Sequence, residues 1–338
     1  MTLPQPSRFQ FADDLVICRI LNGMWQVSGA HGPIEADRAI DEMFAYHDAG
    51  FTTWDLADHY GPAEDFIGAF RRRFAAERGT ARLAEIQAFT KWVPHPGPMT
   101  RRTVEDAIEV SLRRMAVATL DLLQFHWWDY RDRRYLDALR HLADLSREGK
   151  IRHLALTNFD TERLQIIVDQ GIPIVSNQVQ YSLVDRRPEV RMAPFCAGRG
   201  TTLLAYGGLL GGLLSEAYLG RPEPRRSELA TASLQKYKQM IDAWGGWPLF
   251  QELLAVLKAI ADKHGVSIAN IGMRYVLDRP AVAGIIVGTR LGVAQHRADN
   301  ARTFAVALDA GDHAKIETVL AKSHDLMQVI GDCGDEYR

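Results

Sequence analysis

The sequence predicts a (β/α)8 barrel, and three observations lead to this fold class. Short apolar runs of β type alternate strictly with longer segments of helical periodicity along the 338-residue chain. Strict alternation is typical of a parallel sheet with crossover helices, and about eight such units in one chain favour a closed barrel over an open sheet. No GxGxxG motif follows the first strand, which argues against a doubly wound dinucleotide-binding sheet.

The expected elements follow one another in the order that a barrel requires. Residues 8–23 predict an N-terminal hairpin with its turn at Asp13-Asp14, and we expect it to close the end of the barrel opposite the active site. A first strand ends before Met24, and the later strands are expected at 51–57, 85–92, 120–128, 151–159, 173–182, 201–208 and 283–290. Helices are expected at 35–50, 63–79, 100–117, 133–150, 161–171, 189–200 and 250–278, with a last one after residue 290. Gly50 ends the first of these helices, and Thr100 caps the third.

A long stretch, residues 215–249, interrupts the alternation after the seventh strand. It is rich in Pro, Gly and charge, and we interpret it as an insertion or long loop that forms part of a lid through Trp244 and Trp247. The chain contains no repeat of solenoid length and no linker long enough to divide domains. We therefore expect residues 1–338 to form one barrel domain.

Composition excludes several function classes. The formal net charge is −2, so nothing indicates the basic face of a nucleic-acid binder. The longest apolar run, residues 203–214, is too short and too rich in Gly to span a membrane, and no apolar signal-peptide core is visible. The three cysteines, Cys18, Cys196 and Cys333, have neither metal-ligand nor redox-motif spacing, which predicts a reduced, cytoplasmic protein.

Polar and ionisable residues gather where the expected strands end. The stretch WDLADHYG, residues 54–61, places Asp55, Asp58, His59 and Tyr60 at the end of one strand. Chemistry in such barrels occurs at this end, so we expect these side chains to lie near the polar residues at the ends of the other strands: Lys91, His126, Thr157, Asn158, Asn177, Gln178, Tyr206, Gly288, Thr289 and Arg290. Each has a purely structural alternative, such as a loop cap, a rim salt bridge or a core histidine. An Asp, a Tyr, a Lys and a His on three adjacent strands rarely converge by accident.

With these residues in view, the chain resembles the aldo-keto reductase superfamily over nearly its whole length. The resemblance rests on the order and spacing of WDLADHYG, FTKW, LDLLQFHWW, GKIRHLALTNF, NQVQYSLVDRRPE, LLAYGGLLGGLL and IIVGTR…ADN. It implies an NADPH-dependent oxidoreductase that reduces an aldehyde or ketone to an alcohol, or runs the reverse reaction. The catalytic tetrad of the family falls on Asp55, Tyr60, Lys91 and His126.

The chemistry of carbonyl reduction explains these residue types. Hydride transfer to the carbonyl carbon builds charge on the oxygen, which then needs a proton from a positioned acid. Tyr60 is the expected donor, and a cationic Lys91 beside it is expected to lower a phenol pKa that is ordinarily about 10. Asp55 is expected to pair with Lys91, and His126 to orient the substrate oxygen. Residues 58–59 have no tetrad role in the family and are expected to be loop residues.

The resemblance also implies where NADPH or NADP+ binds. Thr157, Asn158 and Gln178 are expected at the nicotinamide carboxamide, and Tyr206 is expected to stack on the ring. The other expected contacts are Met24, Trp25 and Asp55 near the nicotinamide, Gly207, Gly208, Leu209 and Gly211 at the pyrophosphate, Gly288, Thr289 and Arg290 at the 2′-phosphate, and His296, Asp299 and Asn300 at the adenine side. Three positions depart from the family pattern: Leu56 replaces a frequent Thr, Gly207-Gly208 a usual Ser-Pro, and His296 a usual Gln or Arg, with Arg297 beside it to compensate.

Aromatic side chains are expected to surround the substrate. The candidate pocket residues are Trp25, Tyr60, Trp92, His126, Trp127 and Trp128. As a group they favour an apolar or ring-shaped carbonyl or alcohol, although packing under loops is an equal alternative for any one of the tryptophans. No metal ligand is expected, and the oligomeric state stays open.

Two other function classes compete with the enzyme. Some relatives on this fold are channel-associated subunits that hold NADPH and turn over slowly, and such a binding module would retain the cofactor residues and much of the tetrad. A barrel metallohydrolase would need an HxH pair or a comparable cluster on an early strand, and the sequence has none there. Steady-state turnover with a generic aldehyde separates the enzyme from the binding module.

Overall fold

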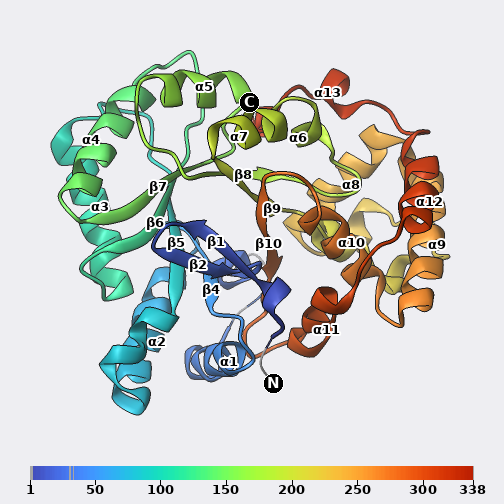
Figure 1. The fold of residues 1–338 in the computed structure, drawn as a ribbon, viewed down its shortest axis with the longest axis horizontal. Coiled ribbons are helices and arrows are strands. Elements are labelled where there is room, and N and C mark those ends of the chain that lie inside the picture. Colours follow the sequence, from blue (N-terminus) through green and yellow to red (C-terminus); the bar gives the residue numbers. More distant parts are fainter. Residues whose placement is uncertain (1–2, 30–31, 33, 338) are drawn as a thin grey trace.

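The computed structural model describes residues 3–29, 32 and 34–337, in which parallel strands close into a barrel (Figure 1). The strands follow the chain around the ring, and the last one returns to pair in parallel with the first. They are β3 (Ile20–Gly23), β4 (Thr53–Asp55), β5 (Gln87–Trp92), β6 (Leu120–Phe125), β7 (Ile151–Thr157), β8 (Ser176–Gln180), β9 (Thr202–Tyr206) and β10 (Val282–Gly288). The predicted (β/α)8 fold class is confirmed.

An antiparallel hairpin precedes the barrel and consists of β1 (Arg8–Ala12) and β2 (Leu15–Cys18). Asp14 in its turn accepts a hydrogen bond from Arg152 over 2.6 Å, and Arg152 lies at the start of β7. The hairpin therefore lies across the amino-terminal end of the strands, as Figure 1 shows. The predicted range of 8–23 was too long, because residues 20–23 are the barrel strand β3. The apolar residues on both sides of Arg19 read as one continuous strand, whereas the chain bends there.

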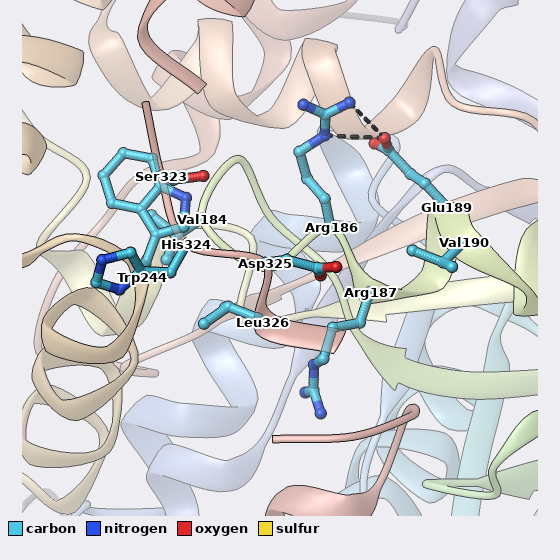
Figure 2. Close-up of a pocket in the computed structure, with 10 residues that line it drawn as sticks. All are labelled: Val184, Arg186, Arg187, Glu189, Val190, Trp244, Ser323, His324, Asp325 and Leu326. Atoms are coloured by element: carbon cyan, nitrogen blue, oxygen red, sulfur yellow. Dashed lines mark hydrogen bonds and ion pairs between the residues drawn. The ribbon is translucent and has the colours of Figure 1, made fainter. Parts of the chain in front are cut away.

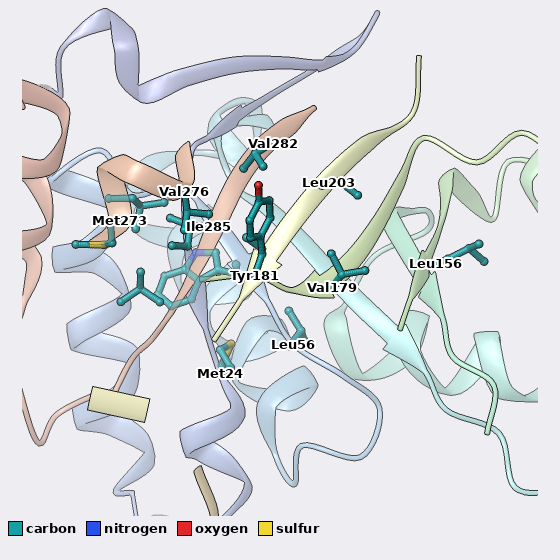
Figure 3. Packing of buried hydrophobic residues seen from close by; sticks show 14 of the residues in the cluster. Met24, Leu56, Leu156, Val179, Tyr181, Leu203, Met273, Val276, Val282 and Ile285 are labelled. Atoms are coloured by element: carbon teal, nitrogen blue, oxygen red, sulfur yellow. The ribbon is translucent and has the colours of Figure 1, made fainter. Parts of the chain in front are cut away.

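Helices surround the barrel (Figure 1). They are α1 (Ala36–Asp48), α2 (Ala63–Arg78), α3 (Arg101–Met115), α4 (Tyr135–Arg147), α5 (Thr161–Asp169), α6 (Arg187–Val190), α7 (Met192–Arg199), α8 (Ala232–Trp244), α9 (Gly246–His264), α10 (Ile268–Leu277), α11 (Arg297–Arg302), α12 (Ala310–Leu320) and α13 (Leu326–Val329). Apolar faces of the helices pack on the outward side chains of the strands. Figure 3 shows Met273 and Val276 of α10 beside Ile285 of β10, and all three are buried.

The expected insertion, residues 215–249, contains α8 and the first turn of α9. Tyr237, Met240, Ile241 and Trp244 of α8 are buried at the three- and four-residue spacing of a helix face. The Pro and Gly residues that favour a loop lie on either side of this helix, at 220–224 and 245–248. This helix is therefore the means by which the inserted segment packs on the barrel.

Candidate active site

The inward face of the barrel changes from apolar to polar along its strands. Phe89 of β5 and Leu122 of β6 belong to the buried cluster beneath the hairpin. The next inward positions, two residues further along each strand, are Lys91 and Gln124. Buried polar groups need partners, so the carboxyl end of the barrel must hold a hydrogen-bond network.

Lys91 and Asp55 form a buried ion pair at the ends of β5 and β4. Nζ of Lys91 donates to Oδ2 of Asp55 over 2.7 Å and to the backbone oxygen of Leu56 over 2.9 Å. Each charged side chain is only 4% exposed. Burial lowers the pKa of Lys91, and the negative charge of Asp55 opposes this shift. Removal of either partner would leave the other charge buried and uncompensated.

Two glutamine amides satisfy the second oxygen of Asp55. Nε2 of Gln124 donates to Oδ1 of Asp55 over 2.9 Å, and Nε2 of Gln178 donates to the same atom over 2.7 Å. Sequence reasoning missed Gln124, which stands inside the apolar run LDLLQF. The two-residue period of a strand could have revealed it, because this period places Gln124 on the inward face with Leu122.

Tyr60 lies in the turn after β4, beside the ion pair. Nζ of Lys91 is 5.0 Å from the centre of the Tyr60 ring, and the Trp25 ring packs against Tyr60 edge-on with 5.0 Å between centroids. Burial raises the pKa of Tyr60 well above its usual range, and the charge of Asp55 adds to this shift. Burial of the phenol and the charge of Asp55 outweigh the expected lowering by Lys91 in this structure. Tyr60 is therefore a neutral phenol here.

His126 follows β6 and is held on two sides. Its Nδ1 lies 3.2 Å from the backbone oxygen of Thr157, and the Trp128 ring packs edge-on against it with 4.4 Å between centroids. A carbonyl oxygen only accepts, so Nδ1 is the donor and the orientation of the imidazole is fixed. The structure places all four expected tetrad residues at the carboxyl end of the barrel: Asp55, Tyr60, Lys91 and His126.

The expected pocket tryptophans separate into two groups. Trp25 and Trp128 contact Tyr60 and His126, and Trp128 is 46% exposed. Trp92 and Trp127 are not brought to the mouth of the barrel, because both are buried and both rings pack against the buried ring of Phe125. Lys91 and Gln124 point inward, so their neighbours Trp92 and Phe125 point outward, towards the helices.

The residues expected at the nicotinamide carboxamide lie together at the ends of β7 to β9. Asn158 adopts a left-handed backbone conformation with φ 58°, which Asn tolerates. Its backbone N–H donates to the backbone oxygen of Gln178 over 2.8 Å. The Thr157 hydroxyl donates to the same oxygen over 3.3 Å. Oδ1 of Asn158 accepts from the Tyr206 hydroxyl over 2.9 Å. The Asn158 amide nitrogen and the Gln178 side-chain oxygen therefore offer one donor and one acceptor, the pair that a carboxamide requires.

A segment that sequence reasoning missed also reaches this end of the barrel. We call residues 332–337 the covering segment. The Tyr206 hydroxyl bonds to Oε1 of Glu336 over 3.1 Å and to the hydroxyl of Tyr337 over 3.1 Å. Arg187, which is buried, donates to Oε2 of Glu336 over 2.9 Å and to the backbone oxygen of residue 332 over 3.0 Å.

Lys236 of α8 bonds to the covering segment. Its Nζ donates to the hydroxyl of Tyr337 and lies 5.1 Å from the centre of the Tyr206 ring. The Tyr337 ring is 6.4 Å from that of His126. The covering segment thus bonds to residues that are about 100 or more positions away in the chain, and no local sequence pattern could predict these contacts.

The glycine-rich run after β9 packs closely on its surroundings. A Cβ at Gly207 would lie 2.5 Å from the Tyr237 hydroxyl of α8, and one at Gly208 would lie 2.4 Å from Cδ1 of Ile285. Close packing within the protein requires glycine at both positions. The expected role of residues 207–211 at a pyrophosphate stays a prediction.

The residues expected at the 2′-phosphate and the adenine follow β10. The Thr289 hydroxyl and N–H both donate to the backbone oxygen of Gly23 over 2.9 Å, so this hydroxyl is directed at the backbone. Arg290 is exposed beside it. Oδ2 of Asp299 accepts from the Ser267 hydroxyl over 2.8 Å, which joins α11 to the start of α10.

Arg297, which we expected to compensate for His296, has an acidic partner of its own. It forms an ion pair with Glu42 of α1, and its guanidinium lies 5.2 Å from the centre of the Tyr46 ring. Asn300 is buried and donates its N–H to the His296 oxygen over 2.8 Å. Glu42 and the Tyr46 ring therefore already engage the Arg297 guanidinium.

A cavity of about 260 Å³ lies near the buried Arg187. Figure 2 shows Arg186 turned towards Glu189 on one side of this cavity, with Trp244 and His324 on the other. None of its lining residues belongs to the expected tetrad. It is therefore distinct from the mouth where Tyr60 and His126 lie.

Within residues 3–29, 32 and 34–337, no helix has the length and apolar character needed to cross a membrane. Nowhere in the same residues do three His, Cys, Asp or Glu side chains gather in a way that could hold a metal ion. Cys18, Cys196 and Cys333 are free and buried.

A closed (β/α)8 barrel with a buried ion pair at the carboxyl ends of its strands has the architecture of a barrel enzyme. The sequence matches the model of the Aldo/keto reductase family over residues 19–321. The chain belongs to this family, which supports an oxidoreductase that acts on small carbonyl compounds with a nicotinamide cofactor.

Individual relatives have low sequence identity to this chain. The chain is 30% identical over 257 residues to flagellar radial spoke protein 5 of Chlamydomonas reinhardtii, covering 66% of this chain but only 49% of that protein. It is 26% identical over 289 residues to aldo-keto reductase YhdN of Bacillus subtilis (strain 168), covering 80% and 81% of the two chains. The structure of the glycerol dehydrogenase from Gluconobacter oxydans superimposes with a TM-score of 0.75 at 22% identity, over 97% and 98% of the two chains, which supports the fold alone.

Proposed function

We propose that this protein is an NADPH-dependent reductase of an aldehyde or ketone, or the corresponding alcohol dehydrogenase, with Tyr60 as the proton donor. The observation that carries the proposal is the buried Lys91–Asp55 pair beside the Tyr60 ring. A buried ammonium is costly, and such groups are concentrated at functional sites.

The proposed reaction gives each side chain a defined task. The reduced nicotinamide supplies the hydride when it is bound. Tyr60 transfers its proton to the substrate oxygen as negative charge develops there. The raised pKa of Tyr60 keeps this proton on the phenol until it is needed, and the nearby Lys91 ammonium stabilises the phenolate that remains. His126, fixed through Nδ1, orients the substrate oxygen.

The side chains at the ends of β7 to β9 fit the cofactor that the proposal requires. Asn158 and Gln178 offer a donor and an acceptor for the carboxamide, and Tyr206 offers a ring on which the nicotinamide can stack. Arg290 is the proposed contact to the 2′-phosphate, because it is exposed and because a guanidinium binds phosphate through two parallel hydrogen bonds. The other proposed contacts are Met24, Trp25, Asp55, Thr157, Gly207, Gly208, Leu209, Gly211, Gly288, Thr289, His296, Asp299 and Asn300.

A substrate panel tests this function. Purified protein is mixed with NADPH and with sugars, steroids, pyridoxal or aromatic aldehydes, and the loss of NADPH absorbance is followed. We expect turnover with at least one apolar or ring-shaped carbonyl, because Trp25 and Trp128 lie beside Tyr60 and His126. A protein that binds NADPH but turns over none of these compounds would contradict the enzyme proposal.

That outcome would favour a second candidate, a cofactor-binding module that serves in an assembly. The observation in its favour is that one relative, at 30% identity, bears the name of a flagellar radial spoke protein. Such a module would keep cofactor affinity without turnover, so the same panel separates the two candidates.

A further inference from the structure

Gln124 occupies a central position in the polar network and has no assigned role. It lies on β6, fully buried, and its amide nitrogen donates to Oδ1 of Asp55 over 2.9 Å. Its side-chain oxygen accepts from Nε2 of Gln178 over 2.6 Å. Gln178 also donates to Oδ1 of Asp55 over 2.7 Å, so the three side chains form a closed ring of hydrogen bonds.

The directions of these bonds are fixed by chemistry. A carboxylate only accepts, so both amide nitrogens must face Asp55. Gln178 then uses one N–H on Asp55 and the other on the oxygen of Gln124. Both amide hydrogens of Gln178 are committed, and its oxygen is the atom left to meet a ligand. Reversal of this amide would bring its oxygen against two other oxygens.

We propose that Gln124 is a positioning residue that acts on both proton transfer and cofactor binding. On one side it stabilises the charge of Asp55, the partner of Lys91. On the other it holds the amide of Gln178 in the orientation that presents an acceptor to the nicotinamide carboxamide. This inference rests on the proposed function, because it assumes a carboxamide at Gln178 and a proton at Tyr60.

Loss of the Gln124 amide should change proton transfer in a predictable direction. The charge of Asp55 raises the pKa of Tyr60, and the N–H of Gln124 disperses part of that charge. Without this N–H the phenolate is less stable, so alcohol oxidation, which needs the phenolate as base, should begin at higher pH. The titratable and charged groups that face Tyr60 stay the same in the variant: Asp55, Asp58, His59, Lys91, Tyr237 and Tyr337.

The variant Gln124→Met tests both proposed roles, in proton transfer and in cofactor binding, because Met keeps the length of the side chain without its amide. We expect the pH profile of alcohol oxidation to move to higher pH. We also expect NADPH affinity, measured by quenching of tryptophan fluorescence, to fall roughly ten- to hundredfold, as when outer partners of metal ligands are lost. The second variant is Gln124→Glu, which can donate and accept like the amide while protonated. It should recover activity at low pH and lose it as its carboxyl group ionises.

Gln180→Met is the matched control. Gln180 is also buried in the barrel, but its amide donates over 2.7 Å to Asp185, outside the Asp55 network. This control should lose stability without a shift of the pH profile. If Gln124→Met keeps both the wild-type profile and NADPH affinity, or if Gln180→Met shifts the profile equally, the role proposed for Gln124 is wrong. Absence of turnover in the wild type would instead contradict the proposed function, and NADPH affinity would then decide on Gln124 alone.

Discussion

The two halves of the barrel mouth satisfy their polar groups in different ways. On the side of β4 to β6, the charged side chains of Asp55 and Lys91 bond to one another and to amides of the barrel itself. On the side of β7 to β9, Tyr206 bonds to Glu336 and Tyr337 of the covering segment. The first half is complete within the barrel wall, whereas the second is completed by side chains from distant parts of the chain. If Tyr60 is the proton donor, as proposed, its surroundings are already in place, whereas a nicotinamide at Tyr206 would meet a residue that is bonded to the covering segment.

The largest effect that would test this contrast is expected at Tyr60. Tyr60→Phe keeps the ring packed on Trp25 and removes only the hydroxyl, so the barrel should fold normally. Carbonyl reduction should fall by at least about 10²–10⁴-fold, as is usual when a positioned general acid is lost. NADPH affinity, measured by tryptophan fluorescence quenching, should stay near the wild-type value. A variant that retains more than about a tenth of the wild-type rate would assign the proton to another group, with His126 or His59 next to be tested.

The contrast between the halves also explains what the sequence could predict. Asp55, Lys91 and His126 could be predicted because each lies within one residue of the end of a strand, and the ends of parallel strands meet at one edge. Gln124 was hidden because an apolar run is read as uniformly buried core, although strand alternation places it inward.

Other parts depend on information that is not local. The orientation of Trp92 depends on which face of β5 it occupies, and the helix α8 lay between segments whose Pro and Gly residues favour a loop. The covering segment reaches Tyr206 across 130 residues of sequence, so its position follows only from the folded chain. Local periodicity therefore predicts the barrel and its strand ends, and tertiary packing determines what covers them.

Lys91→Met is the next strongest test, because it breaks the buried pair. It leaves Asp55 charged and buried, which should lower the free energy of unfolding by about 3–5 kcal/mol in urea denaturation. Carbonyl reduction should fall as well, since the Tyr60 phenolate loses its nearby cation. The double variant Asp55→Asn/Lys91→Met removes both charges and should recover much of the stability but not the activity. If the double variant is as unstable as Lys91→Met, loss of packing and not the uncompensated charge is the cause.

Arg290→Ala tests the cofactor half at its exposed edge. An Arg–phosphate hydrogen bond contributes about 1.5–3 kcal/mol, so NADPH affinity should fall roughly ten- to hundredfold while NADH affinity is almost unchanged. The control is Arg102→Ala, which removes an exposed arginine of α3. Equal losses of NADPH and NADH affinity would show that Arg290 supports the loop and does not read the phosphate.

The smallest expected effect concerns the covering segment. Whether NADPH affinity rises or falls decides how the β7 to β9 side of the barrel mouth should be understood. Tyr337→Phe removes the hydroxyl that bonds to Tyr206 and Lys236, and Glu336→Gln weakens the bonds to Tyr206 and Arg187. Arg187 remains satisfied in both variants, because it also makes two hydrogen bonds of 2.8 Å to Asp185.

Net hydrogen bonds of this kind contribute about 1 kcal/mol each, so NADPH affinity should rise by roughly fivefold if the covering segment competes with the cofactor for Tyr206. Stopped-flow fluorescence should show the gain in the association rate, because the contacts break before the ring can stack. Tyr218→Phe is a suitable control, since that ring packs on Trp247 and not on Tyr206. A fall in NADPH affinity in both variants would reverse the interpretation: Glu336 and Tyr337 would then help to hold the nicotinamide, and the second half would be as prepared for its ligand as the first.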